Sequence, residues 1–169
     1  MARIVQKFGG TSVAGIERIK AAAMKVKRER ERGHQLAVAV SAMSGATDKL
    51  VELTRQASPL HDAREYDVVV SSGEQVTSGL MALCLQELGI PSRSFCGWQV
   101  PIKTDAVHGK ARIEEVVPTE LERLMARGEV PVVAGFQGVT AEGRITTLGR
   151  GGSDTTAVAL AAALKAERC

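Results

Sequence analysis

Three short glycine-containing segments carry the residues of this sequence that could perform chemistry: KFGGTS at 7–12, SAMSGAT at 41–47 and GRGGSD at 149–154. In the first segment, Gly9 and Gly10 allow the backbone to approach a ligand closely, and Lys7 adds a mobile cation. Thr11 and Ser12 can cap a following helix, whose N-terminus carries partial positive charge. The combination is typical of an anion site, most naturally for phosphate. The alternative is a tight strand-to-helix turn with an incidental lysine.

The order of residues in these segments excludes two common nucleotide-binding motifs. A P-loop requires a lysine after its glycines, whereas Lys7 precedes both glycines of the first segment. A dinucleotide-binding fingerprint, GxGxxG, could begin at Gly149 and Gly151, but its third glycine would fall at position 154, which is Asp154. We therefore expect Lys7 at the end of a strand, and a dinucleotide-binding fold is disfavoured.

Two further charged residues lie at positions suited to a ligand. Arg150 lies among glycines with Asp154 as its nearest acid, and a free guanidinium suits bidentate capture of a carboxylate or phosphate. Glu74 opens a predicted helix, where the alternative role is a favourable interaction with the helix dipole. For Asp154 the alternative role is an N-cap.

Hydrophobic patterning and propensity predict alternating strands and helices. The predicted helices are 12–32, 48–56, 74–89, 119–128 and 155–167, and the predicted strands or extended segments are 2–7, 35–40, 67–73, 92–97, 100–102, 111–116, 130–136 and the start of 145–154. This alternation predicts an α/β fold with a mainly parallel sheet. In such sheets ligands bind beyond the carboxyl ends of the strands, so we expect the three segments to converge there.

Composition limits the classes of partner. The chain has 169 residues, 44% hydrophobic and 24% charged, which predicts one globular domain. A net charge of +3 and an aromatic content of 3% argue against a nucleic-acid partner. The basic run KVKRERER at 25–32 interleaves both signs of charge and is typical of a solvated helix face.

Cysteine, histidine and apolar patterns predict a soluble cytoplasmic protein without a zinc site. Three cysteines (84, 96 and 169) form no CxxC pair, which favours reduced thiols in the cytoplasm. The three histidines are scattered without HxxxH spacing. The longest uninterrupted apolar run, at 157–164, is far shorter than the ~20 residues that cross a bilayer, so no membrane partner is expected.

The three segments, together with SSGEQV at 71–76 and AGFQGV at 134–139, resemble the aspartate kinases of the amino acid kinase family. The resemblance runs from Ile4 to Cys169. The pair KFGGTS and TLGRGGSDTTA distinguishes it from uridylate, glutamate and acetylglutamate kinases. The resemblance implies a three-layer αβα sandwich. It also implies transfer of the γ-phosphoryl of MgATP to the side-chain carboxylate of L-aspartate, which gives 4-phospho-L-aspartate for lysine, threonine, methionine and isoleucine synthesis.

The resemblance implies a role for each candidate residue. Lys7 and Asp154 would be catalytic, with Asp154 holding Lys7 against the transferring phosphoryl group. The implied nucleotide-binding residues are Lys7, Phe8, Gly9 and Gly10, and the implied aspartate-binding residues are Ser41, Thr47, Glu74, Arg150 and Ser153. Arg150 would bind a carboxylate and Glu74 the ammonium. An aspartate carboxylate, with a pKa of about 3.9, is already ionised at neutral pH, so the reaction requires charge neutralisation rather than a general base.

The resemblance also modifies the predicted organisation. It implies that 67–73 is helical, against its β-propensity. It implies that residues 1–169 are the N-terminal, aspartate-binding lobe. The nucleotide- and Mg²⁺-binding remainder and the regulatory ACT domains would then lie outside this chain, and no metal ligand is assigned within it. We expect the last helix to have no strand returning to the sheet, which leaves an unpaired edge.

Three consequences follow from this expected organisation. The chain alone is expected to have negligible kinase activity. The full-length enzyme is expected to form a homo-oligomer, most simply a dimer. The alternatives are a non-catalytic module that binds an amino acid or anion or serves oligomerisation, and a kinase for another amino acid such as glutamate.

Overall fold

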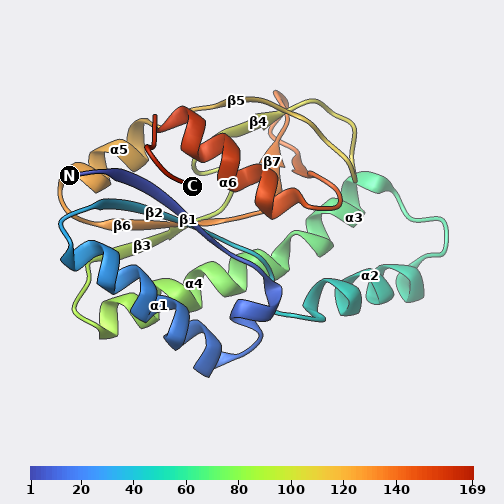
Figure 1. Ribbon diagram of the computed structural model, residues 1–169. Coiled ribbons are helices and arrows are strands. Elements are labelled where there is room, and N and C mark those ends of the chain that lie inside the picture. Colours follow the sequence, from blue (N-terminus) through green and yellow to red (C-terminus); the bar gives the residue numbers. More distant parts are fainter.

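The computed structural model describes residues 1–169, and its centre is a four-stranded parallel sheet (Figure 1). The strands lie in the order β1 (Arg3–Phe8), β2 (Gln35–Val40), β6 (Val130–Ala134) and β3 (Ser92–Phe95). Five of the six residues of β2 are buried, as expected for a parallel strand covered on both faces. The prediction of a parallel sheet is confirmed.

Helices cover both faces of this sheet. One face packs against α1 (Ile16–Glu31) and α4 (Ser72–Glu87), and the other against α5 (Thr119–Ala126) and α6 (Gly152–Ala163). Side chains of β2 alternate between two apolar cores: Leu36 and Val38 join the 17-residue core beneath α1 and α4, and Ala37 joins the 13-residue core beneath α5 and α6. The predicted three-layer αβα sandwich is therefore confirmed.

Two helices extend from the sandwich beyond the end of the sheet (Figure 1). They are α2 (Ala46–Ala57) and α3 (Ala63–Val70), and α3 continues through Ser71 into α4. The helical prediction for 67–73 is confirmed. Asp62 caps α3 by accepting a hydrogen bond from the Arg64 amide at 2.7 Å, and burial of one helix face outweighs the β-propensity of the valines.

The combined helix Ala63–Glu87 is long and apolar enough to cross a membrane on length and composition alone. Half of its most apolar window is buried inside the fold, where α4 packs against α1, β3 and β6. The apolar character of this helix is therefore accounted for by the protein core.

A second, mixed sheet was not predicted from the sequence. Its order is β5 (Ile113–Val116), β4 (Ile102–Thr104), β7 (Gln137–Val139) and β8 (Ile145–Thr147), with antiparallel β4–β5 and β7–β8 pairs. The segment 130–136 ends its strand at Ala134 and turns sharply, and Phe136 has a φ of 72°. The GRGGSD segment therefore follows a strand of the mixed sheet rather than one of the parallel sheet.

No strand follows α6, as predicted, but the last residues of the chain do return to the edge of the sheet as a single bridge. Lys165, with a φ of 50°, reverses the chain, and the Glu167 amide donates to the Arg3 carbonyl at 2.8 Å. The Val5 amide donates to the Arg168 carbonyl at 3.0 Å, which forms a parallel bridge beside β1. The reason is that β1 would otherwise present unpaired backbone groups at its outer edge.

Substitution of Gly135, in the turn after β6, tests the close packing at the end of the sheet. A Cβ on Gly135 would lie 2.7 Å from Ser153 Cβ and 2.8 Å from the Val40 carbonyl oxygen, so Gly135→Ala should destabilise the protein by about 1–3 kcal/mol. The free energy of unfolding from urea titration measures the effect.

The matched control is Gly79→Ala, because a Cβ on this α4 residue meets nothing within 4 Å. We expect it to stabilise the protein by up to about 1 kcal/mol through helix propensity. Equal effects of the two substitutions would contradict the packing argument.

Candidate active site

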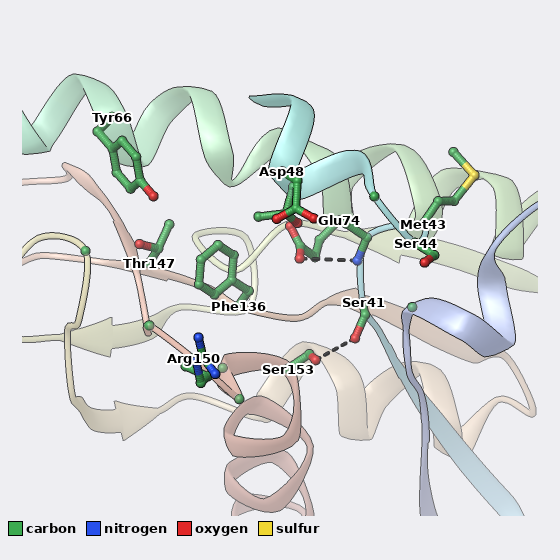
Figure 2. Close-up of a pocket in the computed structure, with 18 residues that line it drawn as sticks. Ser41, Met43, Ser44, Asp48, Tyr66, Glu74, Phe136, Thr147, Arg150 and Ser153 are labelled. Carbon is green, nitrogen blue, oxygen red and sulfur yellow. Dashed lines mark hydrogen bonds between the residues drawn. The ribbon is translucent and has the colours of Figure 1, made fainter. Parts of the chain in front are cut away.

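The three glycine-containing segments meet around one cavity of about 580 Å³. It lies beyond the carboxyl end of β2, between the start of α2 and the start of α6 (Figure 2). All five residues proposed to bind aspartate line it: Ser41, Thr47, Glu74, Arg150 and Ser153. Residues separated by more than 100 positions in the chain thus share one cavity, because successive segments end at the same edge of the fold.

The first two segments are joined by backbone hydrogen bonds. The Ser41 amide donates to the Phe8 carbonyl at 3.0 Å, and the Ser44 amide donates to the Gly10 carbonyl at 3.2 Å. A Cβ on Gly10 would lie 3.2 Å from the Ala42 carbonyl oxygen, so glycine permits this approach. Phe8 ends β1, and Gly9 leads from it into this contact.

The predicted helix caps in the first segment are wrong. Thr11 and Ser12 lie inside a 3₁₀ turn, Gly10–Val13, and neither that turn nor α1 has a side-chain cap. The helix begins only at Ile16, after Gly15. The hydroxyl groups of this segment therefore accept no hydrogen bond from the first amides of α1.

Lys7 and Asp154 form an ion pair with 2.7 Å between Nζ and Oδ1. Asp154 lies in the first turn of α6 behind an uncapped Gly151, so the N-cap alternative is wrong. Lys7 lines a separate hollow of about 380 Å³ together with Phe8 and Arg168, outside the 580 Å³ cavity. Lys7 is therefore not part of the cavity lining, although its partner Asp154 directly follows the cavity residue Ser153.

Serine hydroxyls join the second and third segments. Ser41 Oγ and Ser153 Oγ are 2.6 Å apart, and this contact ties the end of β2 to the start of α6 (Figure 2). Thr47, in the first turn of α2, lines the same cavity. The hydroxyl groups of these three residues, which can donate hydrogen bonds to an anion, are among six in the cavity wall.

Glu74 is a buried carboxylate with one unused oxygen. The residue is only 4% exposed, and Oε1 accepts a hydrogen bond from the Ala42 amide at 3.2 Å. Oε2 is buried without a partner. Burial raises the pKa of the Glu74 carboxyl from 4.5 to about 7. A cationic ligand group in the cavity would supply the missing partner and favour the ionised form.

Arg150 is the cationic counterpart of Glu74 in the cavity wall. It is exposed, and its guanidinium makes no hydrogen bond or ion pair. Gly149 and Gly151 on either side have φ values of 79° and 73°, which suit glycine. A cavity with a free guanidinium, a carboxylate and hydroxyls can hold a small molecule that carries charges of both signs.

Several cavity residues were missed by the sequence analysis: Asp48, Tyr66, Gly109, Phe136 and Thr147. Phe136 could have been found, because it directly follows the buried strand β6. Its amide donates to Thr156 Oγ1 at 3.0 Å, which holds its left-handed conformation against α6. Tyr66, in α3, stacks on His61 just before that helix, with ring centroids 5.1 Å apart.

Comparison with known proteins agrees with this architecture. Residues 2–169 match the sequence model of the family described as the amino acid kinase family. The chain therefore belongs to the amino acid kinase family.

Its relatives within that family include aspartate kinases. The chain is 52% identical to aspartokinase 2 of Bacillus subtilis and 56% identical to aspartate kinase of Pseudomonas putida, over 169 residues in each case. The aligned region is all of this chain and 41% of each relative. The resemblance to aspartate kinases is confirmed, and the chain spans about two fifths of the length of these relatives.

Solved structures give the same result. The aspartate kinase from Synechocystis is 51% identical with a TM-score of 0.81, over 97% of this chain and 27% of that one. Aspartokinase III of E. coli, described as a complex with aspartate and ADP, is 27% identical with a TM-score of 0.87. That match covers 98% of this chain and 47% of the other.

The raised pKa of Glu74 predicts a pH-dependent cost in the protein without ligand. The folded state holds the Glu74 proton more tightly than the unfolded chain, so stability should fall as pH rises from about 4.5 to about 7. Glu74→Gln removes this loss and should be more stable than wild type by up to about 3 kcal/mol at pH 8. Urea unfolding between pH 5 and 8 measures the difference.

Glu87→Gln is the control, because Glu87 is exposed at the other end of the same helix. Its effect on unfolding should be small and constant with pH. A Glu74→Gln difference that does not grow with pH would contradict the assignment.

Proposed function

We propose that this chain forms the acceptor-binding part of an aspartate kinase. The observation that carries the proposal is the single cavity with a free Arg150 guanidinium and a buried, half-satisfied Glu74 carboxylate. L-Aspartate has an ammonium and two carboxylates, which match these charges and the neighbouring hydroxyls. The aspartate kinases among the relatives, one solved with aspartate and ADP, support the same acceptor.

Each substrate group has a proposed partner. Glu74 Oε2 accepts from the ammonium, and Arg150 donates to one carboxylate. Ser41, Thr47 and Ser153 orient the other carboxylate, the one that reacts, through their hydroxyl groups. The Ser41–Ser153 hydrogen bond keeps two of these hydroxyls together before the substrate enters.

The proposed reaction transfers the γ-phosphoryl group of ATP to the side-chain carboxylate of aspartate. An oxygen of the ionised carboxylate bonds to the γ-phosphorus, the bond to the β-phosphate oxygen breaks, and ADP leaves. Both reactants are anions, so the protein must lower their repulsion. We assign this role to Lys7, held by Asp154, and to the backbone around Phe8, Gly9 and Gly10.

Mg²⁺ would further neutralise the ATP phosphates. The chain contains no group of three His, Cys, Asp or Glu side chains that could hold a metal ion. We therefore assign no Mg²⁺ ligand to this chain and no step to a metal bound by it.

The remaining proposals concern the longer protein. We propose that it is cytoplasmic and forms homo-oligomers. The three cysteines are unpaired, and burial raises the pKa of the Cys84 and Cys96 thiols, which keeps them protonated. No nucleic-acid or membrane partner is proposed.

Substitution of Arg150 tests the acceptor site. Arg150→Ala should weaken L-aspartate binding at least thirtyfold, because a charge-assisted contact worth about 2–3 kcal/mol is lost. Isothermal titration calorimetry measures the dissociation constant. Arg28→Ala, a substitution on the charged face of α1, is the control and should bind as wild type does.

Two outcomes would favour the alternatives to this proposal. Tighter binding of L-glutamate than of L-aspartate would indicate another acceptor. Failure of the wild-type chain to bind either amino acid would indicate a module that does not hold an acceptor.

The titration of Glu74 predicts the pH dependence of binding. Since the ligand ammonium requires the ionised carboxylate, affinity for aspartate should rise about tenfold from pH 6 to pH 8. At pH 7 binding should release about half a proton. The measured enthalpy should then change with the ionisation enthalpy of the buffer, and this buffer dependence should vanish in Glu74→Gln. A buffer-independent enthalpy in wild type would contradict the role of Glu74.

A further inference from the structure

Asp67 is a fully buried carboxylate that lies outside the cavity lining. It sits in α3 with an exposed fraction of 0%. Its oxygens accept hydrogen bonds from His108 Nδ1 at 2.7 Å and from the Gly109 amide at 3.1 Å. Thr147 donates to it twice, from Oγ1 at 2.7 Å and from the amide at 3.2 Å. One carboxylate therefore joins α3 to the segment after β4 and to the end of β8.

The partners of Asp67 belong to the cavity wall. Gly109 and Thr147 both line the proposed aspartate site. The two segments also bond to each other, because the Ala111 amide donates to the Thr147 carbonyl at 2.9 Å. A Cβ on Gly149 would lie 3.3 Å from the Gly109 carbonyl oxygen, so the glycine segment packs directly on this anchored backbone.

Arg150 follows Thr147 by three residues and has no contact that fixes its side chain. Leu148, between them, donates its amide to the Phe136 carbonyl at 3.0 Å. The position of the guanidinium is thus set by the backbone that leads to it. That backbone is anchored at Thr147 by Asp67 on one side and at Leu148 by the turn after β6 on the other.

We propose that Asp67 is a positioning residue that holds the glycine segment, and through it Arg150, at the aspartate site. His108 orients the Asp67 carboxylate from the side away from the cavity, where its ring lines a second hollow. The effect on aspartate affinity rests on the proposed function, whereas the effect on the backbone of the glycine segment does not. Each hydrogen-bond partner of Asp67 donates to its carboxylate. The side-chain amide of an asparagine at this position would therefore place its NH₂ group against a donor.

A matched pair of substitutions at His108 separates positioning from general stability. His108→Asn keeps an N–H donor in the place of Nδ1, whereas His108→Leu fills similar space without one. His108 itself is not among the residues that line the cavity, so neither substitution alters a lining side chain. Aspartate titrations followed by NMR chemical shifts should give affinities within twofold of wild type for His108→Asn and about tenfold weaker for His108→Leu.

A double-mutant cycle tests whether the effect passes through Arg150. In an Arg150→Ala background, His108→Leu should change aspartate affinity less than twofold, because the group that it displaces is gone. Additive losses would overturn the proposal and leave Asp67 a purely structural residue. The direct substitution Asp67→Asn should follow the pattern of His108→Leu with a larger loss.

Hydrogen exchange tests the same anchor without a ligand. In His108→Leu the amides of Thr147 and Leu148 should exchange at least fivefold faster than in wild type, while the amides of β2 keep their rates. Faster exchange at both places, or at neither, would overturn the proposal. If the wild-type chain binds no aspartate, the proposed function fails, and exchange alone still decides whether Asp67 holds this segment.

Discussion

The site depends on one close backbone approach, at the turn that follows β6. The Gly135 amide donates to the Val40 carbonyl at 2.9 Å, and its Cα side faces Ser153 with no room for a Cβ. This contact brings the start of α6 against the end of β2. The hydrogen bond between Ser41 and Ser153 follows from it. The cavity is therefore a consequence of sheet topology and of one glycine, with the chemically active side chains added around it.

The two opposite charges of the cavity wall have no ion-pair partner within the protein. Glu74 is buried with an unpaired oxygen, and Arg150 is left without an acid. Removing the buried Glu74 charge should stabilise the protein at neutral pH, as is common where stability and function compete. A ligand that carries both charges satisfies both groups at once. The cavity thus discriminates between molecules by charge arrangement more than by apolar contact.

Sequence patterns predicted the parallel sheet, the two helical layers and the convergence of three glycine-containing segments. They succeeded because β2 and β6 are continuous buried runs and because glycines mark tight turns. The five residues proposed to bind aspartate were assigned through the resemblance to aspartate kinases, and the structure places all five around one cavity. The mixed sheet was missed, since its strands have three or four residues and no clear alternation.

Other features depend on contacts that a linear pattern does not contain. Valines at 68–70 favour a strand, and the burial of Asp67 and Val70 on one face of α3, which packs against α2 and β8, favours the helix instead. Asp67 carries no local signal, because its partners lie 41 and 80 positions away. The return of Arg168 to β1 depends on a left-handed Lys165, a conformation that lysine rarely adopts.

The two cations of the site are held in opposite ways, and the difference suits their proposed tasks. Lys7 is paired with Asp154 before any substrate arrives, so its ammonium is fixed in direction and partly neutralised. Such a cation can stabilise charge that develops during phosphoryl transfer without reorganising. Arg150 is unpaired and exposed, so it retains its full attraction for an incoming carboxylate. Its freedom has a cost in precision, since a guanidinium on a glycine segment can take many positions. An anchor outside the cavity, at the base of that segment, limits this freedom while leaving the charge itself unpaired for the ligand.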